Sequence, residues 1–146
     1  MSDSVIFGLA FAAYVVLGGG VMLSAWGRPA RLLTVAAAVT ASTHVALVWG
    51  FRFEGSLSAA TEKGLAGFIV FHVALATLLA ASLTPQPASR WLSWLAFAIV
   101  TAGAVGAAFK YDYVAGYRIP LLVVAFAVMI FACLGWRHQR THVPSP

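Results

Sequence analysis

Charged residues are scarce in this sequence: they make up only 9% of its 146 residues, whereas hydrophobic residues make up 62%. Soluble globular domains carry about 25% charged residues, so the composition excludes an ordinary soluble domain and indicates an integral membrane protein. The single cysteine, Cys133, rules out an intramolecular disulfide and any paired-cysteine motif. There is also no nucleophile–base pair, phosphate-binding loop or zinc motif, so the sequence lacks the residues that hydrolytic catalysis requires.

Five apolar segments are long enough to cross a bilayer, which takes about 20 helical residues each. They span residues 5–25, 32–51, 64–83, 91–109 and 119–136. We predict an all-α integral membrane protein, a single domain over residues 1–146 built as an up-down bundle of about five transmembrane helices. Four spanning helices with one peripheral segment is the alternative. We read residues 5–25 as a retained first helix rather than a signal peptide, because no basic residue precedes them.

Small residues mark where the helices are expected to approach closely. Gly18, Gly19 and Gly20 stand together in the first segment. In the fourth, "TAGAVGAAF" places small residues four apart, at 102 and 106 and at 103 and 107. Such spacing is typical of close helix packing in membranes.

The charges that remain are distributed unevenly between the two sides of the predicted bundle. One side carries only basic residues, namely Arg28, Arg31, Arg90, Arg137 and Arg140. The other side carries all four acids together with Arg52, Lys63, Lys110 and Arg118. This is the positive-inside pattern. It predicts an N-terminus outside and a C-terminus in the cytoplasm of a bacterial inner membrane. The basic excess then faces anionic lipid head groups, and nucleic acid is not needed to explain it.

Two histidines lie inside apolar segments, His44 in "TASTHVALVWGFRFE" and His72 in "GFIVFHVALATLLAA". An intramembrane histidine is costly unless its ring nitrogens are held. His44 precedes the outer end of its helix by about seven residues, and His72 follows the outer end of the next helix by about eight. At 1.5 Å per residue, both rings lie roughly 10–12 Å below the outer surface. This matched depth suits one iron with two axial histidines, and we predict a bis-histidine haem b.

Neighbouring residues complete the predicted haem site. Thr40 is expected to accept a hydrogen bond from the distal nitrogen of a ligating ring and so fix its tautomer. Phe68 and Ala76 share the helical stripe of His72 and are expected to pack on the macrocycle. Arg52 and Arg118, at the outer surface, are expected to bind the propionates.

Other interpretations of the histidines remain open. His44 and His72 could bond each other, threonines or backbone carbonyls as packing residues, serve as proton relays, or each ligate one chlorophyll-type pigment. His138 and His142 are spaced i, i+4 in "RHQRTH", which would allow a metal site. A solvated tail is the plainer reading of that segment.

The histidine-bearing helices resemble those of small membrane b-type cytochromes and haem-handling proteins. "FHVALATLLAASL" is similar to the haem-ligand helices of haem A synthases, and "THVALVWGFRFEG" resembles a segment of cytochrome c biogenesis proteins. "SRWLSWLAFAIVTAGAVG" resembles a small family of cytochrome oxidase assembly proteins. Each resemblance covers one or two spans, and together they imply a haem-binding membrane protein.

We therefore predict a membrane b-type cytochrome subunit that transfers electrons within a larger respiratory-type complex. Its partners would be other membrane subunits, lipid, and a quinone or a periplasmic cytochrome. Two histidine ligands leave no open iron position, so the chain is not expected to be an enzyme by itself. The alternatives are a cofactor-free accessory subunit of a respiratory or photosynthetic complex and an assembly factor that binds haem transiently.

Overall fold

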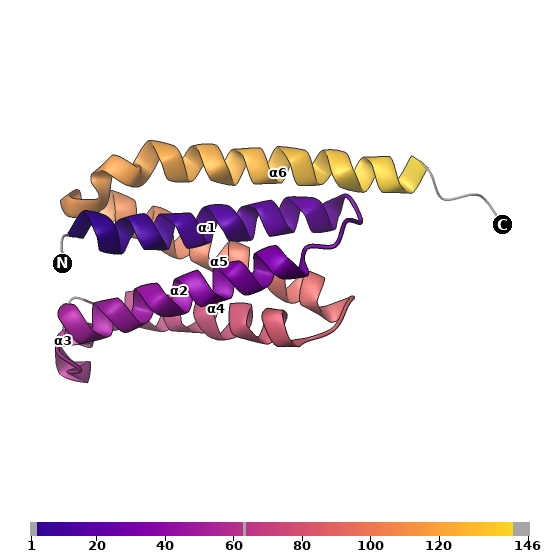
Figure 1. Cartoon of the computed structure of the whole chain (residues 1–146). Helices are drawn as coiled ribbons and strands as arrows, with labels where there is room; N and C mark the ends of the chain where they lie inside the picture. The colour runs from indigo at the N-terminus through magenta and orange to yellow at the C-terminus, as the bar shows by residue number, and fades with distance from the viewer. Residues whose placement is uncertain (1–2, 63, 142–146) are drawn as a thin grey trace.

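The computed structural model describes residues 3–62 and 64–141, and these fold almost entirely into helices (Figure 1). Five long helices are α1 (Asp3–Ala25), α2 (Arg31–Phe51), α4 (Leu65–Leu83), α5 (Ala88–Lys110) and α6 (Arg118–Thr141). Two short elements, α3 (Leu57–Glu62) and the 3₁₀ helix η1 (Asp112–Tyr117), lie in the connections. The five long helices are each apolar and long enough to cross a membrane. The expected number of helices that are long and apolar enough to span a membrane is thereby confirmed.

The helix ends differ from the apolar limits mainly in the last two spans. Helix α5 begins at Ala88, three residues before the expected 91, and α6 continues to Thr141, five residues beyond the expected 136. The last turns of α6 contain arginine and glutamine, which favour helix although they are polar. Hydropathy therefore indicates which part of a helix can contact lipid, whereas the helix itself extends beyond that part.

The long helices run alongside one another, and α1 occupies the middle of the bundle (Figure 1). Helix α1 packs against α2, α5 and α6, while α4 packs against α5 and α2. The core follows the inner stripe of α1, where Tyr14, Leu17 and Val21 are buried. The Tyr14 ring stacks on Phe97 of α5, with the ring centroids 5.1 Å apart.

Glycines allow two of the closest helix contacts, as their spacing predicted. A Cβ added at Gly18 would lie 2.8 Å from Val128 of α6. A Cβ at Gly103 would lie 2.9 Å from Val70 of α4. Gly106 has open space around it, so only one of the two small-residue pairs on α5 marks a close contact.

The outer surface of the bundle is strongly apolar, as expected of a surface that meets lipid. Leu32 is 87% exposed, Leu83 81% and Ile119 75%. The start of α1, α3 and η1 gather at one end of the bundle (Figure 1). This acid-bearing end also contains Glu54, Glu62 and Asp112. The opposite, arginine-rich end contains the α1–α2 and α4–α5 connections and the last turns of α6.

Candidate functional site: a cavity that contains His44

A cavity of about 370 Å³ lies between α1, α2, α4 and α5 toward the acid-bearing end. Its volume is within the range of small-molecule and cofactor sites, about 300–1,000 Å³. Alanine, glycine, leucine and valine form much of the lining. The rest is mainly aromatic, from Phe7, Phe11, Tyr14, Trp49, Phe53, Phe68, Phe71, Tyr111 and Tyr117. The site therefore suits a flat, apolar molecule.

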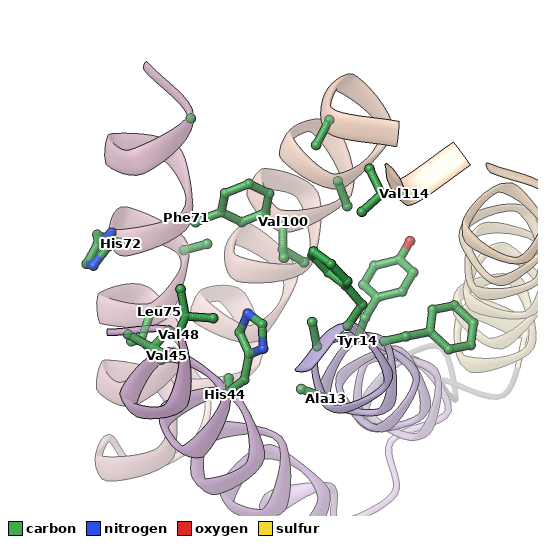
Figure 2. A pocket seen from close by; sticks show the side chains of 18 of the residues that line it. Ala13, Tyr14, His44, Val45, Val48, Phe71, His72, Leu75, Val100 and Val114 are labelled. Carbon is green, nitrogen blue, oxygen red and sulfur yellow. The ribbon is translucent and has the colours of Figure 1, made fainter. Parts of the chain in front are cut away.

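His44 projects from α2 into this cavity (Figure 2). Its Nδ1 lies 2.9 Å from the backbone carbonyl oxygen of Ile6 in α1. A carbonyl can only accept, so Nδ1 carries the proton of the neutral ring and Nε2 keeps its lone pair. Among the described residues, none donates a hydrogen bond to Nε2. The bond to Ile6 thus fixes both the ring orientation and the tautomer that ligates a metal.

Tyr14 adds a second acceptor to the cavity wall. The Thr101 hydroxyl donates to the carbonyl of Phe97 at 2.7 Å. Its oxygen therefore accepts from the Tyr14 hydroxyl, which lies 3.0 Å away. Because the Tyr14 hydroxyl proton is engaged in the bond to Thr101, the Tyr14 oxygen presents only a lone pair to the cavity. His44 and Tyr14 together favour a ligand that is a Lewis acid or a hydrogen-bond donor.

His72 also borders the cavity, but its ring turns to the other side of α4 (Figure 2). Its Nδ1 donates to the Phe68 carbonyl at 2.8 Å, and its Nε2 accepts from the Trp49 indole N–H at 3.4 Å. The ring also packs on that of Phe68, with the centroids 3.9 Å apart. No contact joins the His44 and His72 rings. The structure thus brings the two histidines to one region but points them in different directions.

The face of α4 that lines the cavity differs from the predicted one. Phe71, Ala74 and Leu78 point inward and line the cavity, whereas Ala76 is exposed and does not. Ala76 was expected to pack on a macrocycle, so that assignment is corrected. Phe68 does line the cavity.

Thr40 does not hold the distal nitrogen of His44 as expected. Its hydroxyl donates to the Ala36 carbonyl at 2.9 Å. The Ile6 carbonyl takes the predicted role instead. This partner comes from another helix, so the spacing within α2 could not indicate it.

Arg52 and Arg118 lie at the end of the cavity where propionates were expected. The Arg52 guanidinium lies 5.3 Å from the ring centroid of Phe7, a lining residue. Arg118 Nε donates to the Ala108 carbonyl at 2.7 Å, and its Nη2 lies 3.9 Å from Asp112 Oδ1. Both cations are near the cavity, but both also have contacts within the protein.

The possible metal site at His138 and His142 gains no further metal ligand among the described residues. The His138 ring packs against Trp26, with centroids 5.4 Å apart, and His142 lies outside the described residues. Within residues 3–62 and 64–141 no group of three or more histidine, cysteine or acidic side chains could hold a metal ion.

Sequence reasoning missed the contributions of α1 and η1 to the cavity. Phe7, Phe11 and Tyr14 recur at helical spacing along one stripe of α1. That aromatic stripe was a usable signal for an inward face. The Tyr14–Thr101 bond joins residues 87 positions apart, and no pattern in the sequence indicates it.

Comparison with known proteins yields no matching family model, no matching curated protein and no matching solved structure. The function must therefore be argued from the cavity and its residues.

Proposed function

We propose that this protein is a membrane-embedded b-type haem protein that transfers electrons as a subunit of a larger redox complex, with His44 as the primary iron ligand. One observation carries the proposal. The His44 ring is held by the Ile6 carbonyl so that an unprotonated Nε2 faces an aromatic cavity. A neutral imidazole with its other nitrogen bonded to a carbonyl is a typical metal ligand.

The residues of the cavity fit a haem in three respects. The volume is in the range of cofactor sites. His44 and Tyr14 present lone pairs to the cavity, which suit iron. The lining is flat and apolar, which suits a porphyrin and keeps water from the metal.

Each part of the site would have a distinct task. His44 would ligate the iron through Nε2, and the Ile6 carbonyl would keep the ring from turning. Arg52 and Arg118 would neutralise the propionates by charge-assisted hydrogen bonds. When bound, haem supplies a centre that accepts and releases one electron.

His72 is the proposed second ligand, which makes the site bis-histidine haem b. To ligate, its ring would have to leave the Trp49 N–H and the ring of Phe68. A net intramembrane hydrogen bond contributes only about 0.6 kcal/mol on average, which an iron–nitrogen bond easily offsets. His44 needs no such change, and we therefore rank it first.

The placement in the cell follows from the charge distribution. The arginine-rich end would face the cytoplasm of a bacterial inner membrane, and the cavity would open toward the outer leaflet. Electrons would then pass between a quinone or a periplasmic cytochrome and neighbouring membrane subunits.

The test is a dithionite-reduced minus oxidised spectrum of the detergent-purified protein, expressed with added haem precursor. We expect a b-type α band in the wild type and its loss in His44→Ala. His72→Ala should either abolish the band or change it to a high-spin form. His138→Ala, the same substitution at the opposite end, is the matched control and should leave the spectrum unchanged. A wild type that is folded by circular dichroism yet shows no haem band would refute the proposal.

A second candidate is a cofactor-free accessory subunit, and one observation favours it. Both histidines already make hydrogen bonds between helices, His44 to α1 and His72 to Trp49 of α2. In this case the wild type binds no haem, and His44→Ala lowers the stability of the bundle without any spectral change. The same set of variants therefore separates the two candidates.

A further inference from the structure

The net positive charge of the chain is concentrated at one end of the bundle. The four acids at the acid-bearing end are matched by four cations, so the net charge of +5 belongs to the five arginines of the other end. Arg28, Arg31, Arg90 and Arg137 make no ion pair with any described residue. No acidic residue of the sequence belongs to this end and could pair with them.

Two buried hydrogen-bond donors at this end also lack an acceptor. Among the described residues, none accepts from Arg90 Nε or from Trp94 Nε1. Among the described residues, these are the two buried side-chain nitrogen or oxygen atoms that have no hydrogen-bond partner. Burial of a donor without a partner is unfavourable, so an acceptor at this point would stabilise the protein.

These two donors lie on one face of α5. Arg90 and Trp94 are four residues apart, so one side chain lies a helical turn above the other. The Trp94 ring packs on Trp136 of α6 at a centroid distance of 5.0 Å. Helices α5 and α6 are antiparallel neighbours, and Arg137, which directly follows Trp136, is exposed. The contact between α5 and α6 at this end thus contains a pair of tryptophans, and Arg90 lies one helical turn from Trp94.

We propose that Arg90 and Trp94, beside Trp136 at this end of the α5–α6 contact, bind the phosphate group of an anionic phospholipid. In a bilayer, a lipid phosphate would lie near the depth where the apolar part of α5 begins. Arginine binds phosphate through several donors in a planar fork, and tryptophan N–H groups lie at head-group level in membrane proteins. Basic pockets between transmembrane helices on the cytoplasmic side are suited to anionic head groups.

Binding needs only a local change. Arg90 is partly exposed, so a different rotamer would bring its guanidinium to the phosphate. The lipid site does not depend on haem, because Arg90 and Trp94 lie at the end of the bundle opposite to the cavity.

The test measures lipid binding by native mass spectrometry of the full chain in a neutral detergent. Phosphatidylglycerol and phosphatidylcholine with the same acyl chains are the two probes. We expect the wild type to bind phosphatidylglycerol at least tenfold more tightly. Arg90→Gln should weaken that binding about tenfold, as the loss of a hydrogen bond to a charged group does. Trp94→Phe keeps the ring and loses the N–H, so a loss of about threefold to tenfold is expected.

Arg31→Gln is the matched control, since it removes the same charge from an exposed position at the same end. It should retain the wild-type affinity within about twofold. Equal losses of phosphatidylglycerol affinity in Arg31→Gln and Arg90→Gln would show that diffuse surface charge binds the lipid. That result would overturn the proposed site. Binding of inorganic phosphate as tight as that of the lipid would overturn the lipid as its occupant. Should Arg90→Gln fail to fold, Trp94→Phe decides the question: wild-type affinity in that variant overturns the proposal.

Discussion

The contact at Gly103 allows a prediction whose magnitude follows from the structure. In Gly103→Ala, the new Cβ would lie 2.9 Å from Val70 Cγ1 and 3.3 Å from the ring of Phe71. Valine in a helix has one strongly preferred χ1 rotamer, so Val70 cannot simply turn away. The helices α4 and α5 have to separate slightly, and overpacking of this kind costs about 1–3 kcal/mol.

A matched substitution isolates this cost from helix propensity. Alanine stabilises a helix interior by about 0.5–1 kcal/mol relative to glycine, and Gly106→Ala gains this without any contact within 4 Å. We therefore expect Gly106→Ala to be slightly more stable than the wild type. Gly103→Ala should be less stable than Gly106→Ala by about 1–3 kcal/mol.

The assay is equilibrium unfolding in mixed micelles, followed by circular dichroism for both variants. A Val70→Ala background removes the closest clashing atom, so Gly103→Ala should cost less there, with a coupling energy of about 1–2 kcal/mol. If Gly103→Ala and Gly106→Ala were equally stable, the close approach of α4 and α5 at this point would be wrong.

Three further substitutions test other contacts by the same unfolding assay. Gly135→Ala places a Cβ 2.9 Å from the Ala25 carbonyl oxygen. Because the backbone cannot move aside, we expect a loss of stability of about 2–3 kcal/mol. A variant as stable as the wild type would contradict this contact. Tyr14→Phe removes the hydrogen bond to Thr101 while the stacked ring remains, and it should cost about 0.5–1.5 kcal/mol. Asp112→Asn should leave the unfolding midpoint unchanged at all salt concentrations, because this carboxylate is fully exposed and its ion pair is 3.9 Å long.

The number of the long helices and most of their limits were predictable because lipid imposes a simple requirement on the sequence. A spanning helix needs about 20 apolar residues, and short polar connections leave little freedom in where it ends. The extension of α6 to Thr141 was not predictable from hydropathy, since the residues beyond 136 are polar but still form helix.

The orientation of each helix about its axis was much less predictable. In water, one apolar stripe identifies the buried face of a helix. In α4 nearly every residue is apolar, so Phe71 and Ile69 look alike in the sequence. Yet Phe71 lines the cavity, and Ile69 is 49% exposed on the outer surface. The prediction placed His72 and Ala76 on the inner face, and only the packing of α4 on α5 could have corrected it.

The depth of a residue and the direction of its side chain are thus separate properties, and the sequence informs mainly the first. His44 and His72 have equivalent positions along their helices, but the structure gives them unequal chemistry. The Nε2 lone pair of His44 faces the cavity, whereas that of His72 already accepts the Trp49 N–H. Iron binding through His44 alone would need no rearrangement, while bis-histidine ligation would couple iron binding to the α2–α4 contact. Loss of the Trp49 N–H should therefore strengthen a bis-histidine site and leave a single-histidine site unchanged.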